Sequence, residues 1–274
     1  MLPHPPNALD LIRAALPAGY EIVDYIDRGG QAAVFDGKYE GRRAAIKIFN
    51  PTAEQERVNR EIEALRAIDC DYLVKVLDST IITLQGQAVP VIAYEFLDGG
   101  DLRALLPPAN NTPPALPILR DLGLHVGTAI EALWSAQPNR RIVHRDIKPA
   151  NIVRAGARFV LADIGLARHL DLPTITMPGL APGTRGYMSP EQAMGRRNLT
   201  IHSDIFSFGV TLYHVACGIH PFNGRQDAIG VMSPIPVASH RADLPPQLCR
   251  LVDSMLSVAP HRRPSVLRAA FQVM

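Results

Sequence analysis

Residues 144–151 read HRDIKPAN, and this stretch decides how the rest of the chain is interpreted. Working outward from it, the triplet DIG occupies residues 163–165 and the triplet SPE occupies residues 189–191. Upstream, the triplet AIK at residues 45–47 precedes Glu61. Because so many motifs follow one another in a set order, chance is a poor explanation for them. They indicate one extended fold.

Together these motifs resemble the catalytic domain of the eukaryotic-like (Hanks-type) Ser/Thr protein kinases, over roughly residues 20–270. The pattern H-R-D-x-x-x-x-N of that family is filled at every named position. The resemblance implies a bilobal α+β fold with a β-rich N-lobe that carries one helix and a larger, mainly helical C-lobe. We expect residues 1–18 to be a lead-in, residues 19–97 the N-lobe and residues 98–274 the C-lobe.

The resemblance also implies an activity, the transfer of the ATP γ-phosphate to protein Ser/Thr hydroxyls. In such a transfer the protein mainly positions the reactants and stabilises the charge of the transition state. Asp146 is expected to accept the proton of the substrate hydroxyl, and Lys148 to neutralise charge on the moving phosphoryl group. Thr184 lies where Ser/Thr kinases carry a Thr that bonds both of these residues. The pairing of Lys148 with Thr184 therefore favours Ser/Thr substrates over Tyr.

ATP and a divalent ion, Mg²⁺ or Mn²⁺, are the expected cofactors. Lys47 is expected to hold the α- and β-phosphates, and Glu61 to pair with Lys47 and hold it in place. Asn151 and Asp163 supply the hard oxygen ligands that Mg²⁺ prefers. The triplet that begins at Asp163 has Ile where the family commonly has Phe, but the metal chemistry belongs to the Asp.

The glycine-rich loop is the weakest motif. The pattern G-x-G-x-x-G-x-V falls on residues 27–34, where the first glycine is Asp27 and the third is Ala32. Gly29 and Gly30 remain, and they can still bring backbone N–H groups close to phosphates. Taken alone, the stretch predicts a hairpin turn equally well. Its distance before the AIK triplet favours the nucleotide-binding interpretation.

The remaining nucleotide contacts are implied by the resemblance. Residues 94–102, YEFLDGGDL, look like the hinge between the lobes, and Tyr94 occupies the gatekeeper position. A strand that ends in a Gly-Gly turn is equally consistent with this stretch. The residues expected to contact adenine or ribose are Val34, Ala45, Glu95, Leu97, Asp101 and Val153.

Residues 163–191 form the expected activation segment. Thr174 and Thr176 stand in a Pro-flanked polar loop, and the T-x-T arrangement resembles autophosphorylated loops of bacterial Ser/Thr kinases. Arg145 and Arg168 could clamp a phosphothreonine through bidentate hydrogen bonds. The alternative is a pair of unmodified loop threonines.

Two buried ionic contacts are expected to hold the C-lobe together. Glu191 is expected to pair with Arg263, and Asp204 to accept hydrogen bonds from the backbone of the catalytic loop. The loss of either would leave a buried charge unpaired.

Composition excludes several other classes. The chain has 274 residues, 47% of them hydrophobic and 20% charged, with a net charge of +2. This charge is too small to indicate nucleic-acid binding. Three scattered Cys residues favour a reducing compartment, and neither a signal peptide nor a membrane helix is recognisable, so a cytoplasmic location is expected. The expected partners are protein substrates and a second copy of the chain for trans-autophosphorylation. The native chain could continue into a further segment.

The pattern of residues predicts the elements. Strands are expected in residues 20–26, 33–39, 42–49, 74–82 and 89–96, and helices in residues 9–16, 54–68, 119–135 and 203–217. Residues 106–117 contain five prolines and are expected to lack regular structure.

Two other functions compete with an active protein kinase. A pseudokinase that binds nucleotide or acts as a scaffold would suit the eroded glycine loop, although the catalytic and metal residues are intact. A small-molecule kinase of the aminoglycoside-phosphotransferase type would share the ATP-binding residues. It would lack the SPE triplet, the loop threonines and the Arg263 partner.

Overall fold

The computed structural model describes residues 8–28, 32–51, 62–63, 65–107, 111–136, 141–163 and 186–273. The chain divides into two compact units. The first contains the described residues up to Ala67 together with Val74–Leu97, and the second contains Ile68–Leu73 and the described residues from Asp98 onward. Among the described residues, no helix combines the length and apolar character needed to span a membrane.

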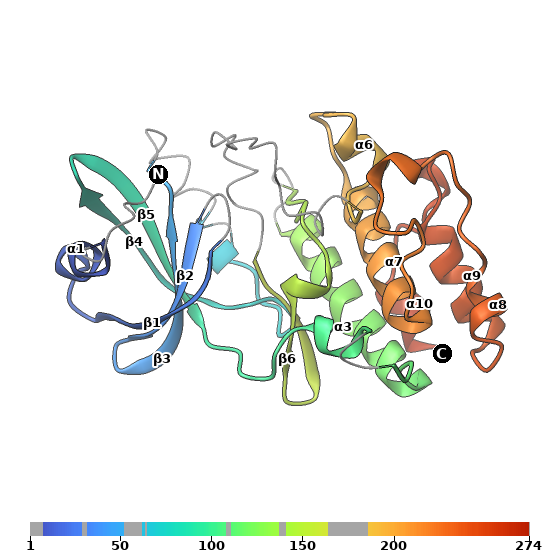
Figure 1. The fold of residues 1–274 in the computed structure, drawn as a ribbon, viewed down its shortest axis with the longest axis horizontal. Helices are drawn as coiled ribbons and strands as arrows, with labels where there is room; N and C mark the ends of the chain where they lie inside the picture. The colour runs from blue at the N-terminus through green and yellow to red at the C-terminus, as the bar shows by residue number, and fades with distance from the viewer. Residues whose placement is uncertain are drawn as a thin grey trace. The chain divides into compact units, whose positions relative to one another are not determined.

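The first unit is built on a five-stranded antiparallel sheet with the strand order β1-β2-β3-β5-β4 (Figure 1). Residues on β3 alternate in burial, with Ala44, Ile46 and Ile48 completely buried. This period of two is what a strand with one core-facing side requires. All five predicted strands are confirmed. Their bounds are β1 (Tyr20–Arg28), β2 (Ala32–Tyr39), β3 (Arg42–Phe49), β4 (Val76–Leu84) and β5 (Gln87–Glu95).

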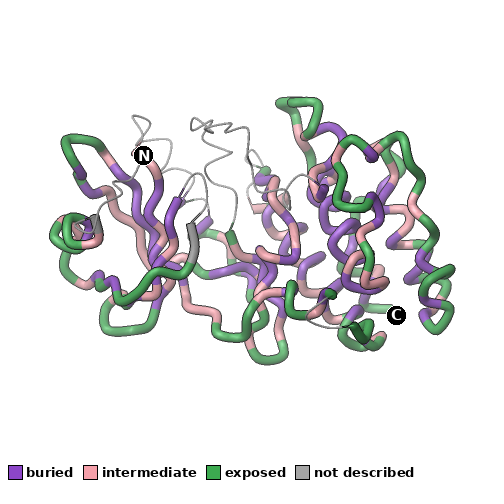
Figure 2. The backbone as a smooth tube through the Cα atoms, in the orientation of Figure 1, coloured by how far each residue is buried: buried purple, intermediate pink, exposed green. Residues whose placement is uncertain are grey.

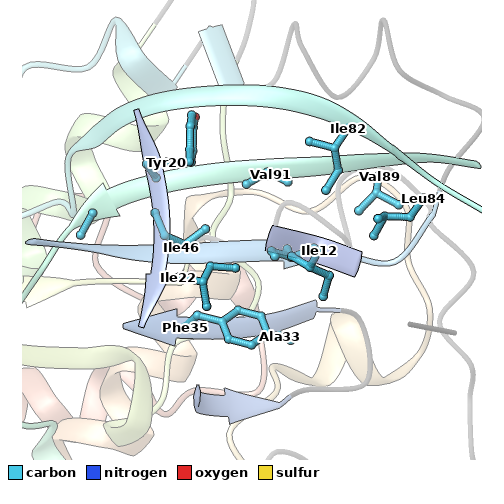
Figure 3. Packing of buried hydrophobic residues seen from close by; sticks show 13 residues of the cluster. Ile12, Tyr20, Ile22, Ala33, Phe35, Ile46, Ile82, Leu84, Val89 and Val91 are labelled. Carbon is cyan, nitrogen blue, oxygen red and sulfur yellow. The ribbon is translucent and has the colours of Figure 1, made fainter. Parts of the chain in front are cut away.

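Helix α1 (Ala8–Ala15) covers one face of this sheet, and it confirms the predicted lead-in helix. Its Ile12 is 3% exposed and packs into the cluster that also contains Phe35, Ile46 and Val91 (Figure 3). Because the side chains of a strand alternate between faces, the opposite face of the sheet carries the intervening residues of β2 and β3.

The second unit is mainly helical (Figure 1). Helix α7 (Ile201–Cys217) is buried along nearly its whole length, as its apolar sequence predicts (Figure 2). Helix α10 (Arg268–Gln272) lies close against helix α3 (Leu116–Ser135), because a Cβ at Gly123 of α3 would lie only 2.3 Å from the ring of Phe271 of α10. The elements are η1 (Leu102–Leu105), α3 (Leu116–Ser135), η2 (Pro149–Asn151), β6 (Ile152–Ala155), β7 (Arg158–Leu161), α6 (Pro190–Ala193), α7 (Ile201–Cys217), η3 (Gln226–Ala228), α8 (Val237–His240), α9 (Pro246–Met255), η4 (Pro260–Arg262) and α10 (Arg268–Gln272).

The prediction that residues 106–117 lack regular structure is wrong for the last two of them, Leu116 and Pro117. Helix α3 already begins at Leu116, with Pro117 in its first turn. Proline is tolerated there because the first N–H groups of a helix have no partner within the helix. The predicted helix over residues 54–68 lies mostly outside the described residues, although residues 62–63 and 65–66 are helical.

The segment Ile68–Leu73 belongs to the second unit although the sequence continues from it into the first. The Leu161 backbone N–H donates to the Tyr72 carbonyl at 2.8 Å, and Arg158 donates to the Asp71 carbonyl at 2.7 Å. The Tyr72 ring also stacks on His125 of α3 with the ring centroids 4.2 Å apart. These contacts tie the segment to β7 and α3. A sheet and a helical unit together confirm the predicted α+β class.

Candidate active site

The buried carboxylate of Asp204 holds the backbone of the catalytic loop. Asp204, in the first turn of α7, accepts hydrogen bonds from the backbone N–H groups of His144 and Arg145 at 2.6 and 2.9 Å. Arg145 has a φ of +68°, a left-handed conformation that non-glycine residues rarely adopt. Burial raises the pKa of Asp204 to about 7, while the two N–H donors act to lower it. The predicted contact between Asp204 and the loop is confirmed.

The ring of His144 connects the catalytic loop to the residue before Asp163. His144 is completely buried, and its Nε2 lies 3.1 Å from the carbonyl oxygen of Ala162. Its Nδ1 accepts the backbone N–H of Asp146 at 3.3 Å. The neutral ring with its proton on Nε2 satisfies both contacts, because a carbonyl oxygen can only accept.

The carboxylate of Asp146 is held by two neighbours on the same loop. Lys148 Nζ donates to Asp146 Oδ2 at 2.9 Å, and Asn151 Nδ2 donates to the same oxygen at 3.0 Å. The side chains of Lys148 and Asp146 are only 19% and 16% exposed. Partial burial strengthens these charge-assisted bonds relative to a surface pair. The loop therefore presents an oriented carboxylate with a cation beside it.

The structure brings together Asn151 and Asp163, the two residues expected to bind a divalent metal ion. Asn151 Nδ2 also donates to the backbone carbonyl of Asp146 at 2.7 Å, so the amide NH₂ is directed at Asp146 and Oδ1 is the atom that would bind a metal ion. The Ala162 N–H donates to the Asn151 carbonyl at 2.8 Å, which brings the next residue, Asp163, beside Asn151. Asp163 has a φ of +58° and is exposed. Amide and carboxylate oxygens are the donor set that Mg²⁺ binds.

The first unit carries three predicted nucleotide contacts on one face of its sheet. Val34 pairs with Lys47 across β2 and β3, and Lys47 pairs with Ile92 across β3 and β5. Ala45 pairs with Tyr94 in the same way. Directly paired residues point to the same side of a sheet, so these side chains share the face opposite α1. The structure brings Val34, Ala45 and Lys47 together on that face.

The end of β5 is fixed by contacts within the first unit. The side chain of Glu95 accepts the Lys75 N–H at 2.9 Å, and the Glu95 N–H donates to the Lys75 carbonyl at 3.0 Å. The Arg43 guanidinium lies 3.6 Å from the ring centroid of Phe96. Contacts with Lys75 and with Arg43 therefore hold the backbone that leads into Leu97.

Asp101 and Val153 lie together in the second unit, where their backbones form an isolated β-bridge. The Asp101 carboxylate also caps η1, because its Oδ1 accepts the Arg103 N–H at 2.9 Å. Close backbone approach is needed here, since a Cβ at Gly99 would lie 2.2 Å from the Arg154 carbonyl oxygen. The expected ribose and adenine contacts are thus neighbours.

Helix α6 adds a contact that the sequence motifs did not predict. Ser189 and Gln192 form a capping box at its start. Gln192 Nε2 also donates to the Arg145 carbonyl at 2.9 Å, which joins this helix to the catalytic loop. The S-x-x-Q pattern indicates the cap, but the second bond of Gln192 depends on tertiary structure.

The predicted pair of Glu191 and Arg263 is confirmed. Arg263 Nη1 and Nη2 donate to the two carboxylate oxygens of Glu191 at 2.7 and 3.1 Å. Ser203 Oγ donates to the same carboxylate at 2.6 Å. The Arg263 side chain is 0% exposed and that of Glu191 is 9% exposed. The pair anchors the SPE triplet to α7 and to the residues after α9.

Seven of the predicted site residues lie outside the described residues, so the structure leaves their roles as predictions. They are Gly29, Gly30, Glu61, Arg168, Thr174, Thr176 and Thr184.

Comparison with known proteins identifies the family. A protein kinase domain model matches residues 20–273. The serine/threonine-protein kinase AfsK of Streptomyces coelicolor is 31% identical over 254 residues, which cover 90% of this chain and 30% of the relative. The serine/threonine-protein kinase PknA of Corynebacterium glutamicum is 32% identical over 249 residues, which cover 87% of this chain and 50% of the relative.

Solved structures agree on the fold. A crystal structure of the Mycobacterium tuberculosis PknI kinase domain has a TM-score of 0.70 and 22% sequence identity, and the match covers 93% of this chain and 94% of that chain. The predicted protein-kinase fold is therefore confirmed. The chain spans only 30% of AfsK and 50% of PknA, the two curated relatives described above. Matched along almost all of its length by the domain model, the chain belongs to the protein kinase family.

Proposed function

We propose that this chain is the catalytic domain of a Ser/Thr protein kinase, which transfers the γ-phosphate of ATP to Ser/Thr hydroxyls of proteins. The observation that carries the proposal is the carboxylate of Asp146, held between Lys148 and Asn151 on a loop that the buried Asp204 braces. Relatives that share 31% and 32% identity with the chain are named serine/threonine-protein kinases, which supports Ser and Thr as the residues that receive the phosphate.

In this reaction the substrate hydroxyl oxygen forms a bond to the γ-phosphorus while the bond from that phosphorus to the bridging oxygen of ADP breaks. Asp146 accepts the proton that the hydroxyl loses, and ADP departs with the bonding electrons. Lys148, 2.9 Å from the Asp146 carboxylate, stands where it can neutralise charge on the phosphoryl group. A proton acceptor and a cation at this spacing are what in-line transfer requires of the loop.

The nucleotide is proposed to be bound by the residues that the sequence motifs predict. Mg²⁺ or Mn²⁺, when bound by Asn151 and Asp163, supplies charge neutralisation for the phosphates. Lys47 is proposed to bind the α- and β-phosphates, supported by its place on the sheet face that carries Val34 and Ala45. The other proposed contributions are the glycine backbone of Gly29 and Gly30, the ion-pair partner Glu61, the hinge residues Glu95 and Leu97, and Asp101 and Val153 for ribose and adenine.

The direct test is incubation of the purified chain with Mg-ATP and a degenerate Ser/Thr/Tyr peptide library, followed by mass spectrometry. We expect phosphate on Ser and Thr but not on Tyr, in line with the proposed pairing of Lys148 with Thr184. ADP binding by calorimetry without any transfer would overturn the proposal and leave a nucleotide-binding scaffold. Transfer to aminoglycosides but not to peptides would instead indicate a small-molecule kinase.

Phosphorylation of the activation segment is a separate expectation. Thr174 and Thr176 are proposed as autophosphorylation sites, with Arg145 and Arg168 binding the phosphate. A phosphothreonine that gains one to three charge-assisted hydrogen bonds would order the segment, so Thr174→Ala/Thr176→Ala is expected to lower kcat by about tenfold. Initial rates on the best library peptide measure this effect. Full activity of the double variant would contradict the switch.

Trans-autophosphorylation would make this labelling second order in protein concentration. We therefore expect the fraction of phosphorylated Thr174 and Thr176 at a fixed time to rise with chain concentration when it is measured by mass spectrometry. A fraction that does not depend on concentration would indicate a reaction within one chain and would exclude trans-autophosphorylation by a second copy.

A further inference from the structure

Helix α1 lies outside the part of the chain that the protein kinase domain model matches, because that match begins at residue 20. The helix nevertheless belongs to the core of the first unit. Ile12 packs in the same buried cluster as Ile22 of β1 and Ile82 of β4 (Figure 3). Leu9, which is partly buried, packs against this cluster as well. Any contribution of α1 to the activity would therefore come in addition to the motifs described above.

The chain turns back from α1 onto β1 through residues 16–19. Gly19 has a φ of +91°, a conformation that a residue with a Cβ rarely adopts. The Gly19 carbonyl accepts the Glu40 N–H at 2.8 Å, and the Tyr20 N–H donates to the Pro17 carbonyl at 3.3 Å. These bonds fix the turn, which brings β1 within reach of the side chains of α1.

Arg13, in the last turn of α1, binds two successive carbonyls of β1. Its Nε donates to the Ile22 carbonyl and its Nη2 to the Val23 carbonyl, both at 3.3 Å. Because β1 is an edge strand, one of its sides has no neighbouring strand. The donors of a guanidinium form a rigid planar fork, which suits two acceptors that lie side by side. Arg13 therefore supplies the hydrogen bonds that a neighbouring strand would supply at this point of the edge.

The two carbonyls lie at an irregularity in the pairing of β1 with β2. The register shifts by one residue between Ile22 and Asp24, so Val23 has no partner on β2. In a regular strand successive carbonyls point to opposite sides, whereas a bulge can turn two of them to the same side. A bulge also bends its strand and increases the local twist. The two hydrogen bonds from Arg13 therefore stabilise the bend of β1.

The bend matters because β1 leads directly into the glycine-rich loop. The strand ends at Arg28, one residue before Gly29, and its Asp27 pairs with Val34 of β2. The start of β1 is held as well, since the Tyr20 hydroxyl donates to the Asp78 carboxylate of β4 at 2.9 Å. The course of β1 between these two points depends on the bulge.

We propose that Arg13 is a positioning residue, which fixes the bend of β1 and so sets the glycine-rich loop over the phosphates of the nucleotide. This inference rests on the proposed function, in which the backbone of Gly29 and Gly30 binds those phosphates. Nucleotide binding orders the groups that contact it, and this ordering costs free energy. A strand that is already fixed before binding lowers the cost. The loop has Asp27 and Ala32 where the family has glycines, so this contribution offsets part of what the missing glycines would supply.

The proposal is tested with Arg13→Ala, which removes both hydrogen bonds to β1. The side chain is 46% exposed, so the variant is expected to fold. We expect the Kd for ADP, measured by calorimetry, and the KM for ATP to rise about fivefold. The kcat and the KM for the best library peptide should not change, because Asp146 and its loop belong to the other unit. Arg13→Lys, which keeps the cation and a donor, is expected to recover part of the affinity.

Two matched controls separate the contact with the β1 backbone from a general effect of charge. Lys38 is also 46% exposed, and it pairs with the side chain of Glu21 on β1 at 3.0 Å without contacting the bulge. Asp10→Asn removes only the ion pair that Arg13 forms within α1, at 3.6 Å. Lys38→Ala and Asp10→Asn should both leave the Kd for ADP unchanged. An equal rise in Lys38→Ala and Arg13→Ala would show that any lost charge on this sheet weakens binding, and it would overturn the inference.

Hydrogen exchange distinguishes the failure of this inference from the failure of the proposed function. In the absence of nucleotide, the amides of residues 23–28 are expected to exchange faster in Arg13→Ala than in the wild type or in Lys38→Ala. A wild type that binds ADP but transfers no phosphate contradicts the proposed function alone. Wild-type exchange of these amides in Arg13→Ala, or a wild-type Kd for ADP in that variant, contradicts the inference alone.

Discussion

Replacing Asp146 by Asn is expected to lower kcat by about 10²- to 10⁴-fold, the contribution typical of a general base. The amide has the shape of the carboxylate and can still accept from Lys148, but it cannot take the proton of the substrate hydroxyl. The loop should keep its geometry, because Asp204 braces its backbone and not its side chains. The rate of ³²P transfer from labelled ATP measures the effect.

Two controls test whether the fall in kcat comes from the loss of the base and not from weaker nucleotide binding or from the substitution of an aspartate as such. ADP binding by calorimetry should be the same in Asp146→Asn as in the wild type, because the proposed nucleotide contacts come from other residues. Asp227→Asn makes the same chemical change at a side chain that is 70% exposed, and it should leave kcat unchanged. A kcat for Asp146→Asn within tenfold of the wild type would mean that Asp146 is not the base.

Replacing Arg263 by Ala is expected to lower the free energy of unfolding by about 3–5 kcal/mol, the usual cost of breaking a buried ion pair from one side. The substitution leaves the Glu191 carboxylate without its cation. It also removes the donors to the carbonyls of His202, Ser257 and Val258, which lie 2.7 to 3.0 Å from the guanidinium. Urea unfolding followed by circular dichroism measures the change.

The matched control for this prediction is Arg225→Ala. Arg225 also pairs with a carboxylate, that of Asp227, but the two side chains are 66% and 70% exposed. Surface pairs of this kind contribute only about 0–1 kcal/mol, so the control should unfold almost like the wild type. Equal losses for Arg263→Ala and Arg225→Ala would show that burial of the pair does not matter.

The same pair predicts a pH dependence. Burial by itself would raise the pKa of Glu191, but hydrogen bonds from Arg263 and Ser203 outweigh it and the pKa lies below the ordinary 4.5. The folded state therefore holds the proton less tightly than the unfolded state. The stability that the pair contributes is present above about pH 4.5 and is lost as the pH falls through the lower folded pKa. Arg263→Ala should lack this part of the acid dependence.

The sequence predicted the centre of the site well because its chemistry is local. Asp146, Lys148 and Asn151 stand within six positions of one another, so a short loop brings them together whatever surrounds it. The strand face with Val34, Ala45 and Lys47 follows from the alternation of residues along two paired strands. The contacts of Asp204 and Arg263 were predicted from their places in the sequence, Asp204 near the start of the apolar stretch 203–217 and Arg263 in the stretch HRRPS.

The contacts of Tyr187 with His214 and His220 and the second bond of Gln192 could not be predicted in the same way. Tyr187 and His214 are 27 positions apart, and Gln192 and Arg145 are 47 positions apart. Neither histidine has the spacing of a ligand, and for that reason the sequence favours a simple surface or core role for both. The packing of α7 and of the loop after it brings His214 and His220 into contact with Tyr187.

By itself the sequence determines which residues are available for phosphoryl transfer, in what order they occur, and that a sheet precedes a helical unit. These properties depend on side-chain chemistry and on hydrophobic periods of 2 and 3.6 residues, both of which are local. The sequence also predicts that Asp204 supports the catalytic loop, whereas only the tertiary structure decides that the same helix, α7, holds the segment before α6 through His214. That arrangement depends on long-range packing, in which buried polar groups take whichever partners the fold brings within hydrogen-bonding distance.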